Sequence, residues 1–154
     1  IGGLAARVYP GAMTTMPNIP VDPVSAATAK VAKRLVELCR TGQNLDAIKE
    51  LYADDAAHVE AMSMPGAPPE SRTIRGKANL LAKAEQWARG TTIHSATCGD
   101  PRVNADQFAC EMTLDATGKE GPMAGQRMNV NEIAVYTVKN NKIAEARFFY
   151  GCQG

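Results

Sequence analysis

From residue 25 to residue 90 the apolar positions recur mainly at helical spacing. Val31, Leu35 and Leu38 fall at i, i+4 and i+7, which predicts a helix over 25–40 with Ser25 as its N-cap. A shorter helix is expected to follow and to end near Tyr52. A third helix is expected over 77–89, because Gly90 is a typical C-terminal stop. Its buried side is predicted to carry Leu80, Leu81, Ala84, Trp87 and Ala88.

After Gly90 the apolar period changes to two, which is typical of strands with one buried face. The strands are expected over 91–98, 106–117, 127–139 and 142–150, and a short strand over 57–62 precedes the third helix. Asp54 and Asp55 are interpreted as a turn, and 64–76 as a loop. This order predicts an α+β fold in which three helices pack on one face of a strongly bent, mainly antiparallel sheet. Such a cone leaves a pocket with one open end.

The N-terminal part of the chain differs from the rest. Residues 1–24 contain four prolines and no sustained period, which predicts an extended arm in front of one domain over 25–152. A chain of 154 residues is long enough for one domain with a substantial core.

Charge and composition narrow the function classes. With 17 basic and 16 acidic residues, the net charge is +1, and no Lys/Arg cluster indicates nucleic acid as a partner. No apolar run is long enough to span a membrane, and no signal-peptide pattern is present, so a cytoplasmic protein is expected. The four cysteines form no CxxC pair and have no histidine at zinc-ligand spacing, so we expect reduced thiols packed as small apolar residues and no metal site. No cofactor motif is present.

Strand alternation gives the candidate chemistry. His58, Glu60 and Met62 share one face of their strand, and Glu132 shares a face with Ala134. A carboxylate in an apolar pocket has a raised pKa, which suits it to accept a proton near neutral pH, and a histidine beside it can relay the proton. Glu60, His58 and Glu132 are therefore the candidate catalytic residues. They can equally form a buried hydrogen-bond network with no catalytic role, and Glu132 can instead pair with Arg127 or Arg147.

Aromatic and sulfur-containing residues are candidates for the pocket wall. Each also has a simpler interpretation as a core residue, or for His94 as a hydrogen-bonded strand residue. The candidate substrate-binding residues are Tyr150, Trp87, Met62, Phe108, Met112 and His94.

Two stretches resemble a known family. The first stretch is similar to the SnoaL-like and ketosteroid isomerase group of the nuclear transport factor 2-like superfamily. It begins with residues 51–56 (LYADDA), which are followed by a strand, a Pro/Gly-rich loop and Ile74-Arg-Gly76 before a helix. The ending YTVKNNKI (136–143) and RFFY (147–150) resembles the terminal hairpin of that group. The resemblance spans about 26–150 and implies a cone-shaped α+β fold that hosts isomerases, cyclases, dehydratases, hydrolases and non-catalytic binders.

The resemblance also assigns positions. The catalytic carboxylate of the ketosteroid isomerases falls on Glu60, and the aromatic residue that abuts it falls near Tyr150. The two oxyanion donors of those isomerases fall near Leu35 and Ala134, and neither side chain can donate a hydrogen bond.

Two functions are therefore expected, from different classes. One is a cofactor-independent isomerase, cyclase, dehydratase or hydrolase acting on a small apolar oxygenated molecule. The other is a non-catalytic domain that binds a hydrophobic ligand or dimerises. In both cases Ile133, Val135 and Phe149 on the outer sheet face favour a homodimer.

Overall fold

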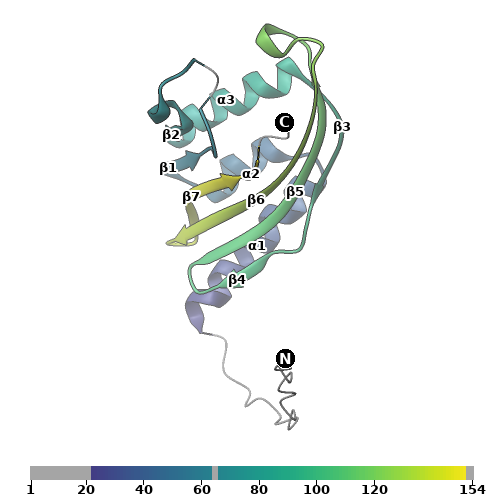
Figure 1. Ribbon diagram of the computed structural model, residues 1–154. Helices are drawn as coiled ribbons and strands as arrows, with labels where there is room; N and C mark the ends of the chain where they lie inside the picture. The colour runs from purple at the N-terminus through teal and green to yellow at the C-terminus, as the bar shows by residue number, and fades with distance from the viewer. Residues whose placement is uncertain (1–21, 64–65, 152–154) are drawn as a thin grey trace, which may run out of the picture.

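The computed structural model describes residues 22–63 and 66–151 of the chain (Figure 1). The helices are α1 (Pro23–Arg40), α2 (Asn44–Leu51) and α3 (Lys77–Gly90). The long strands are β1 (Tyr52–Val59), β3 (Thr91–Cys98), β5 (Gln107–Gly118), β6 (Arg127–Lys139) and β7 (Lys142–Phe149). Two short strands are β2 (Thr73–Arg75) and β4 (Arg102–Asn104), and single 3-10 turns lie at Pro69–Arg72 and Gly121–Met123.

The strands form one curved sheet that the three helices cover on its concave side (Figure 1). The strand order is β2-β1-β7-β6-β5-β3, with β4 added beside β5. Every pairing is antiparallel except that of β1 with β7. The predicted α+β architecture of three helices on a bent, mainly antiparallel sheet is thus confirmed.

The sheet bends because its ladders are interrupted. The pairing of β3 with β5 shifts between Ile93 and Ser95, and the pairing of β6 with β7 shifts between Thr137 and Val138. An extra residue in one strand increases local twist and bending. Figure 1 shows the result, with β3, β5 and β6 curving around the helices.

The first helix begins earlier than the sequence pattern predicts. Its N-cap is Asp22, whose carboxylate accepts hydrogen bonds from the Ser25 backbone N–H at 2.9 Å and the Ser25 hydroxyl at 2.6 Å. Pro23 follows at a position where the missing N–H costs nothing. The assignment of Ser25 as the N-cap is therefore wrong, and Pro23 and Val24 belong to α1. The rest of the expected arm, residues 1–21, lies outside the described residues.

The first strand also begins earlier, at Tyr52 instead of residue 57. Asp54 and Asp55 lie within β1 and not in a turn. The pairing of β1 with β7 shifts register between Tyr52 and Ala57, and in this stretch both carboxylates are exposed to solvent. At its other end β1 stops at Val59, before the predicted end at Met62. The short strands β2 and β4 were not predicted, since three residues are too few to display a period.

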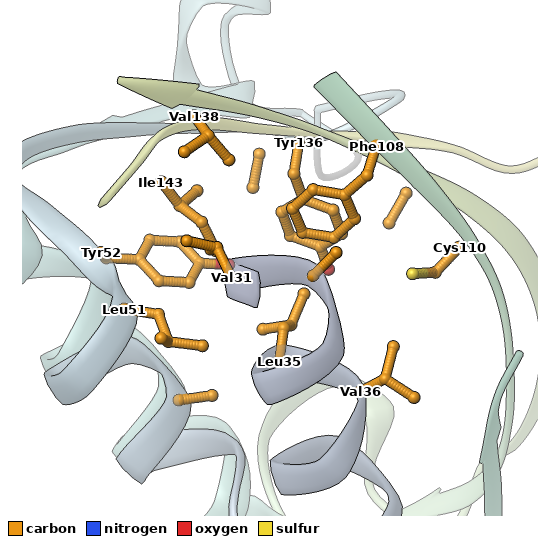
Figure 2. Packing of buried hydrophobic residues seen from close by; sticks show 14 of the residues in the cluster. Val31, Leu35, Val36, Leu51, Tyr52, Phe108, Cys110, Tyr136, Val138 and Ile143 are labelled. Carbon is orange, nitrogen blue, oxygen red and sulfur yellow. The ribbon is translucent and has the colours of Figure 1, made fainter. Parts of the chain in front are cut away.

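The main core lies between helices α1 and α2 and the concave face of strands β1, β5, β6 and β7. Figure 2 shows Leu35 of α1 beneath the rings of Phe108 and Tyr136, with Ile143 and Tyr52 alongside. The two rings stack with centroids 4.7 Å apart, and Phe108 is only 1% exposed. Burial of an aromatic side chain of this size stabilises the fold by about 1.5–3 kcal/mol.

Helix α3 packs differently from α1 and α2. Leu80 is its only buried residue, whereas Trp87 is 37% exposed and Ala88 is exposed as well. The prediction that Trp87 and Ala88 are buried is wrong, because this end of α3 covers a cavity instead of the sheet.

No helix in the described part of the chain combines the length and hydropathy that a bilayer crossing requires. The cytoplasmic location stays a prediction.

Candidate functional site

Glu60 stands at the centre of a polar cluster that joins three elements. Its Oε1 atom lies 2.9 Å from Nε2 of His58 and accepts a hydrogen bond from Lys83 Nζ of α3 at 2.8 Å. Its Oε2 atom accepts a hydrogen bond from the Tyr150 hydroxyl, just beyond β7, at 3.1 Å. Both carboxylate oxygens are therefore occupied.

Local strand geometry explains why these groups meet. His58 pairs with Ala146 of β7, which faces the helices and is fully buried, so the side chain of His58 also points to the concave side. There its ring stacks on that of Phe148, with centroids 4.4 Å apart. After β1 ends, the Glu60 backbone N–H still donates to the Arg72 carbonyl at 2.8 Å, so Glu60 keeps the face of His58.

The pKa of Glu60 is lowered. Burial by itself raises this pKa, but the hydrogen bonds from His58 and Lys83 and the positive charge of Lys83 outweigh it and bring the pKa to about 2. Glu60 is therefore ionised at any physiological pH. The expectation of a raised pKa at Glu60 is wrong, because Lys83 lies beside it.

Glu132 has the opposite electrostatic character. It pairs with Met112 across β5 and β6 and faces the concave side. Burial, followed by the negative charge of Glu60, raises its pKa to about 7. Neither expected arginine partner reaches it, since Arg127 binds Asp115 and Arg147 binds Glu145. Within the described residues, Glu132 forms no hydrogen bond or ion pair.

A cavity of about 600 Å³ opens beside this cluster, between α2 and α3 on one side and the concave sheet on the other. Its wall is mostly apolar, and His58, Glu60, Lys83 and Glu132 form its ionisable end. The apolar part of the wall includes Leu45, Ile48, Trp87, Ile93, Met112 and Phe148. We call this space the inner pocket.

A second depression of about 730 Å³ lies at the outer face of the sheet, lined by residues such as Arg72, Glu111 and Ile133. We call it the outer groove. Glu60, Glu132 and Phe148 line both spaces, so the carboxyl pair lies at the boundary between them.

Three of the predicted wall residues lie elsewhere. Phe108 is in the core against Tyr136. His94 is exposed and bonded to the Thr117 hydroxyl at 2.7 Å, because the register shift between Ile93 and Ser95 takes it out of the expected alternation. Met62 is 39% exposed and outside the inner pocket, because β1 ends before it; its backbone is a partner of the Tyr150 phenol.

The other predicted residues lie at or next to the inner pocket. Trp87 and Met112 line it. Tyr150 lines the outer groove and donates a hydrogen bond to Glu60, which borders both spaces. Sequence reasoning missed Lys83 and gave no role to Phe148. A signal for Lys83 existed, since it follows Leu80 by three residues and precedes Trp87 by four on one helix stripe.

A family profile of the SnoaL-like domain matches residues 26–150. The chain belongs to the SnoaL-like family. A crystal structure from Mesorhizobium loti, of a protein provisionally named as a SnoaL-like polyketide cyclase, is 38% identical to this SnoaL-like chain. It covers 79% of this chain and 97% of its own, with a TM-score of 0.70.

More distant structures share the nuclear transport factor 2-like cone. One from Jannaschia sp. CCS1 is 14% identical, covers 86% of this chain and 90% of its own, and has a TM-score of 0.64. One from Pseudomonas putida KT2440 is 19% identical, covers 81% and 92%, and has a TM-score of 0.60. Both carry provisional names as polyketide cyclases. No curated protein matches this SnoaL-like chain.

The two carboxyl groups of this SnoaL-like site are expected to change the stability of the fold in opposite directions as the pH changes. The Glu132 pKa is raised, so the folded state binds more protons than the unfolded state between pH 4.5 and 7, and stability falls as the pH rises through this window. Glu132→Gln removes the cost of a buried charge and should stabilise the protein by about 1–2 kcal/mol at pH 8, after allowance for partial exposure. At pH 5 it should change stability little. Denaturant unfolding at the two pH values measures both effects.

Glu60→Gln is the matched control, with the opposite sign. Because the Glu60 pKa is lowered, its stabilising contribution is present above pH 4.5 and is lost as the pH falls towards 2. The substitution should therefore destabilise the protein at pH 7. Equal effects of the two glutamine variants at pH 8 would contradict the assigned charge states.

Proposed function

We propose that this SnoaL-like protein is a cofactor-independent acid–base enzyme that acts on a small apolar oxygenated molecule in the inner pocket. The reaction belongs to the isomerase, cyclase, dehydratase or hydrolase type, in which a proton moves between substrate atoms or water is activated. The observation that supports this most strongly is Glu132, a carboxyl group with a pKa of about 7 and no partner among the described residues, beside an apolar cavity.

A proton carrier works best when its pKa lies near the operating pH, because both protonation states are then populated. Glu132 meets this condition and Glu60 does not. We therefore place the transferred proton on Glu132. Glu60 acts as a fixed negative charge that helps to raise the Glu132 pKa and that orients His58, Lys83 and Tyr150.

Lys83 takes a second role in this proposal. Its ammonium group has three N–H donors and uses one on Glu60, so it can offer another to a substrate oxygen. It lines the inner pocket. Leu35, which also lines this pocket, and Ala134 fall at the family positions for oxyanion donors, and both side chains are apolar and buried. A cation beside a developing oxyanion stabilises the transition state of proton abstraction next to a carbonyl.

The alternative is a non-catalytic domain that holds a hydrophobic ligand. It requires that the polar groups of the pocket satisfy one another. Glu60, His58, Lys83 and Tyr150 meet that requirement, but Glu132 does not. The unpaired acid therefore favours the enzyme.

Glu132→Gln should abolish turnover while ligand binding is retained. The amide has nearly the same shape but cannot accept a proton, and loss of a general base typically costs about 100- to 10,000-fold in rate. A panel of apolar ketones, epoxides and polyphenols is incubated with the wild-type chain, and products are followed by mass spectrometry. The wild-type rate should also rise with increasing pH, and the rise should have an apparent pKa near 7.

Trp87→Phe is the matched control, because it alters the pocket wall without touching a titratable group. It should change substrate affinity more than turnover. A compound that binds the wild-type chain tightly but is never converted, across the whole panel, would contradict the enzyme and support the ligand-binding domain.

We also propose that the chain forms a homodimer through the outer sheet face. Ile133 pairs with Phe149 across β6 and β7, and each side chain is 52% exposed. Two adjacent large apolar residues on an open sheet face are typical of a protein contact.

Ile133→Asp should convert the dimer to a monomer in sedimentation velocity experiments, because the contact would then bury an unpaired carboxylate. Val24→Asp is the control, since Val24 is equally exposed at 53% but lies on α1. A wild-type chain that sediments as a monomer at all concentrations would contradict the proposal.

A further inference from the structure

Three cysteine side chains meet where the end of α1 packs against β3 and β5. The Cys98 thiol interacts with both the Cys39 thiol and the Cys110 thiol. Its Sγ also donates a hydrogen bond to the Gly99 carbonyl at 3.9 Å. This cluster could not be predicted from the sequence, because the three residues come from separate elements and form no motif. No grouping of three metal ligands is found in the described residues, so the cluster has no metal-site geometry.

Access differs among the three thiols. Cys39 and Cys98 line the inner pocket, so a small molecule in the pocket can reach them. Cys110 does not line it and is only 1% exposed. The cluster therefore has two thiols at the pocket surface and one behind them.

Two side-chain hydrogen bonds hold the end of α1, which carries Cys39, close to the end of β3, which carries Cys98. Arg40 Nε donates to the Cys98 carbonyl at 2.8 Å, and Arg40 Nη2 donates to Asp100 at 2.8 Å. These bonds fix the last turn of α1 to the end of β3. Cys39 lies in that last turn, just before the Thr41–Gly42 stop.

Cys110 is less suited to such a link with Cys98. The ladder pairs Cys98 with Met112, so Cys110 is displaced by two residues along β5. Diagonal neighbours in a sheet have Cα atoms about 7–8 Å apart, which exceeds the roughly 4.4–6.8 Å that a disulfide requires.

The thiols also differ in acidity. Hydrogen bonds from Cys110 and Cys39 lower the pKa of Cys98, with a further contribution from the charge of Arg40. The pKa values of Cys39 and Cys110 are raised by their bonds to Cys98 and by burial. The thiolate is the reactive form of cysteine, so Cys98 is the nucleophile of the cluster.

We propose that Cys98 and Cys39 form a redox-active thiol pair that reacts with small hydroperoxides entering the inner pocket. The Cys98 thiolate attacks the terminal peroxide oxygen, the O–O bond breaks, and the alcohol (or water) leaves with one proton, so that Cys98 becomes a sulfenic acid. The Cys39 sulfur then attacks the Cys98 sulfur, the S–O bond breaks and water leaves. In total the two thiols lose two electrons and two protons, and one hydroperoxide is reduced. The step uses neither Glu60 nor Glu132.

Peptide mapping of the full chain tests this pair directly. Trypsin places each cysteine in its own peptide: Cys39 in 35–40, Cys98 in 90–102, Cys110 in 103–119 and Cys152 in 148–154. The native protein is treated with cumene hydroperoxide or hydrogen peroxide, remaining thiols are alkylated, and the digest is analysed by mass spectrometry. The expected product is a reducible link between peptides 35–40 and 90–102, with the loss of two free thiols per chain.

Two variants refine the test. In Cys39→Ser, Cys98 should stop at the sulfenic acid and react with dimedone, whereas Cys110→Ser should still form the 39–98 link. If Cys110→Ser fails to fold, the wild-type map alone decides, because a 39–98 link identifies the pair without any variant. A link between 90–102 and 103–119 would overturn the choice of Cys39. Oxidation confined to Cys152, or a 39–98 link that forms only in urea, would overturn the proposal as a whole.

Discussion

Two carboxylates face one apolar pocket, and within the described residues only one of them has partners for its charge. Glu60 receives hydrogen bonds from His58, Lys83 and Tyr150, and it remains ionised. Its negative charge and the surrounding apolar wall then make a second negative charge at Glu132 unfavourable. The same network ties β1, α3 and the residue after β7 together at the pocket. The titration of Glu132 therefore depends on a cluster that is also structural.

The family fold fixes where these groups can lie, but not which of them reacts. The resemblance to the ketosteroid isomerases assigns the catalytic carboxylate to Glu60, but in this chain Lys83 forms an ion pair with it. The positions of the two oxyanion donors hold Leu35 and Ala134, both buried among apolar residues. In the proposed function, proton transfer therefore falls to Glu132, and hydrogen bonding to a substrate oxygen falls to Lys83. The same cone-shaped fold can thus hold a distribution of charges that differs from that of the ketosteroid isomerases.

Much of the fold and of the strand faces at the site could be predicted from the sequence. The features that could not be predicted depend on contacts between distant elements. The period of two correctly grouped His58 with Glu60, and Glu132 with Ala134, on one strand face each, because alternation is a local property. The period failed for His94, where a register shift intervenes, and for Met62, which lies beyond the end of β1. The charge states of Glu60 and Glu132 could not be assigned, because they depend on tertiary contacts. The pKa of Glu60 depends on His58 and on Lys83, 23 residues along the chain, and that of Glu132 on burial and on the charge of Glu60.

The most direct test of this account is the titration of the two carboxyl groups by carbon-detected NMR on protein labelled at the glutamate side chains. Glu132 is expected to titrate near pH 7 and Glu60 near pH 2. In Glu60→Gln the Glu132 pKa should fall but stay above 4.5, because burial is the larger cause of its shift. A Glu132 pKa close to 4.5 in the wild-type chain would contradict the account, since Glu132 would then be a permanently charged residue and not a proton carrier.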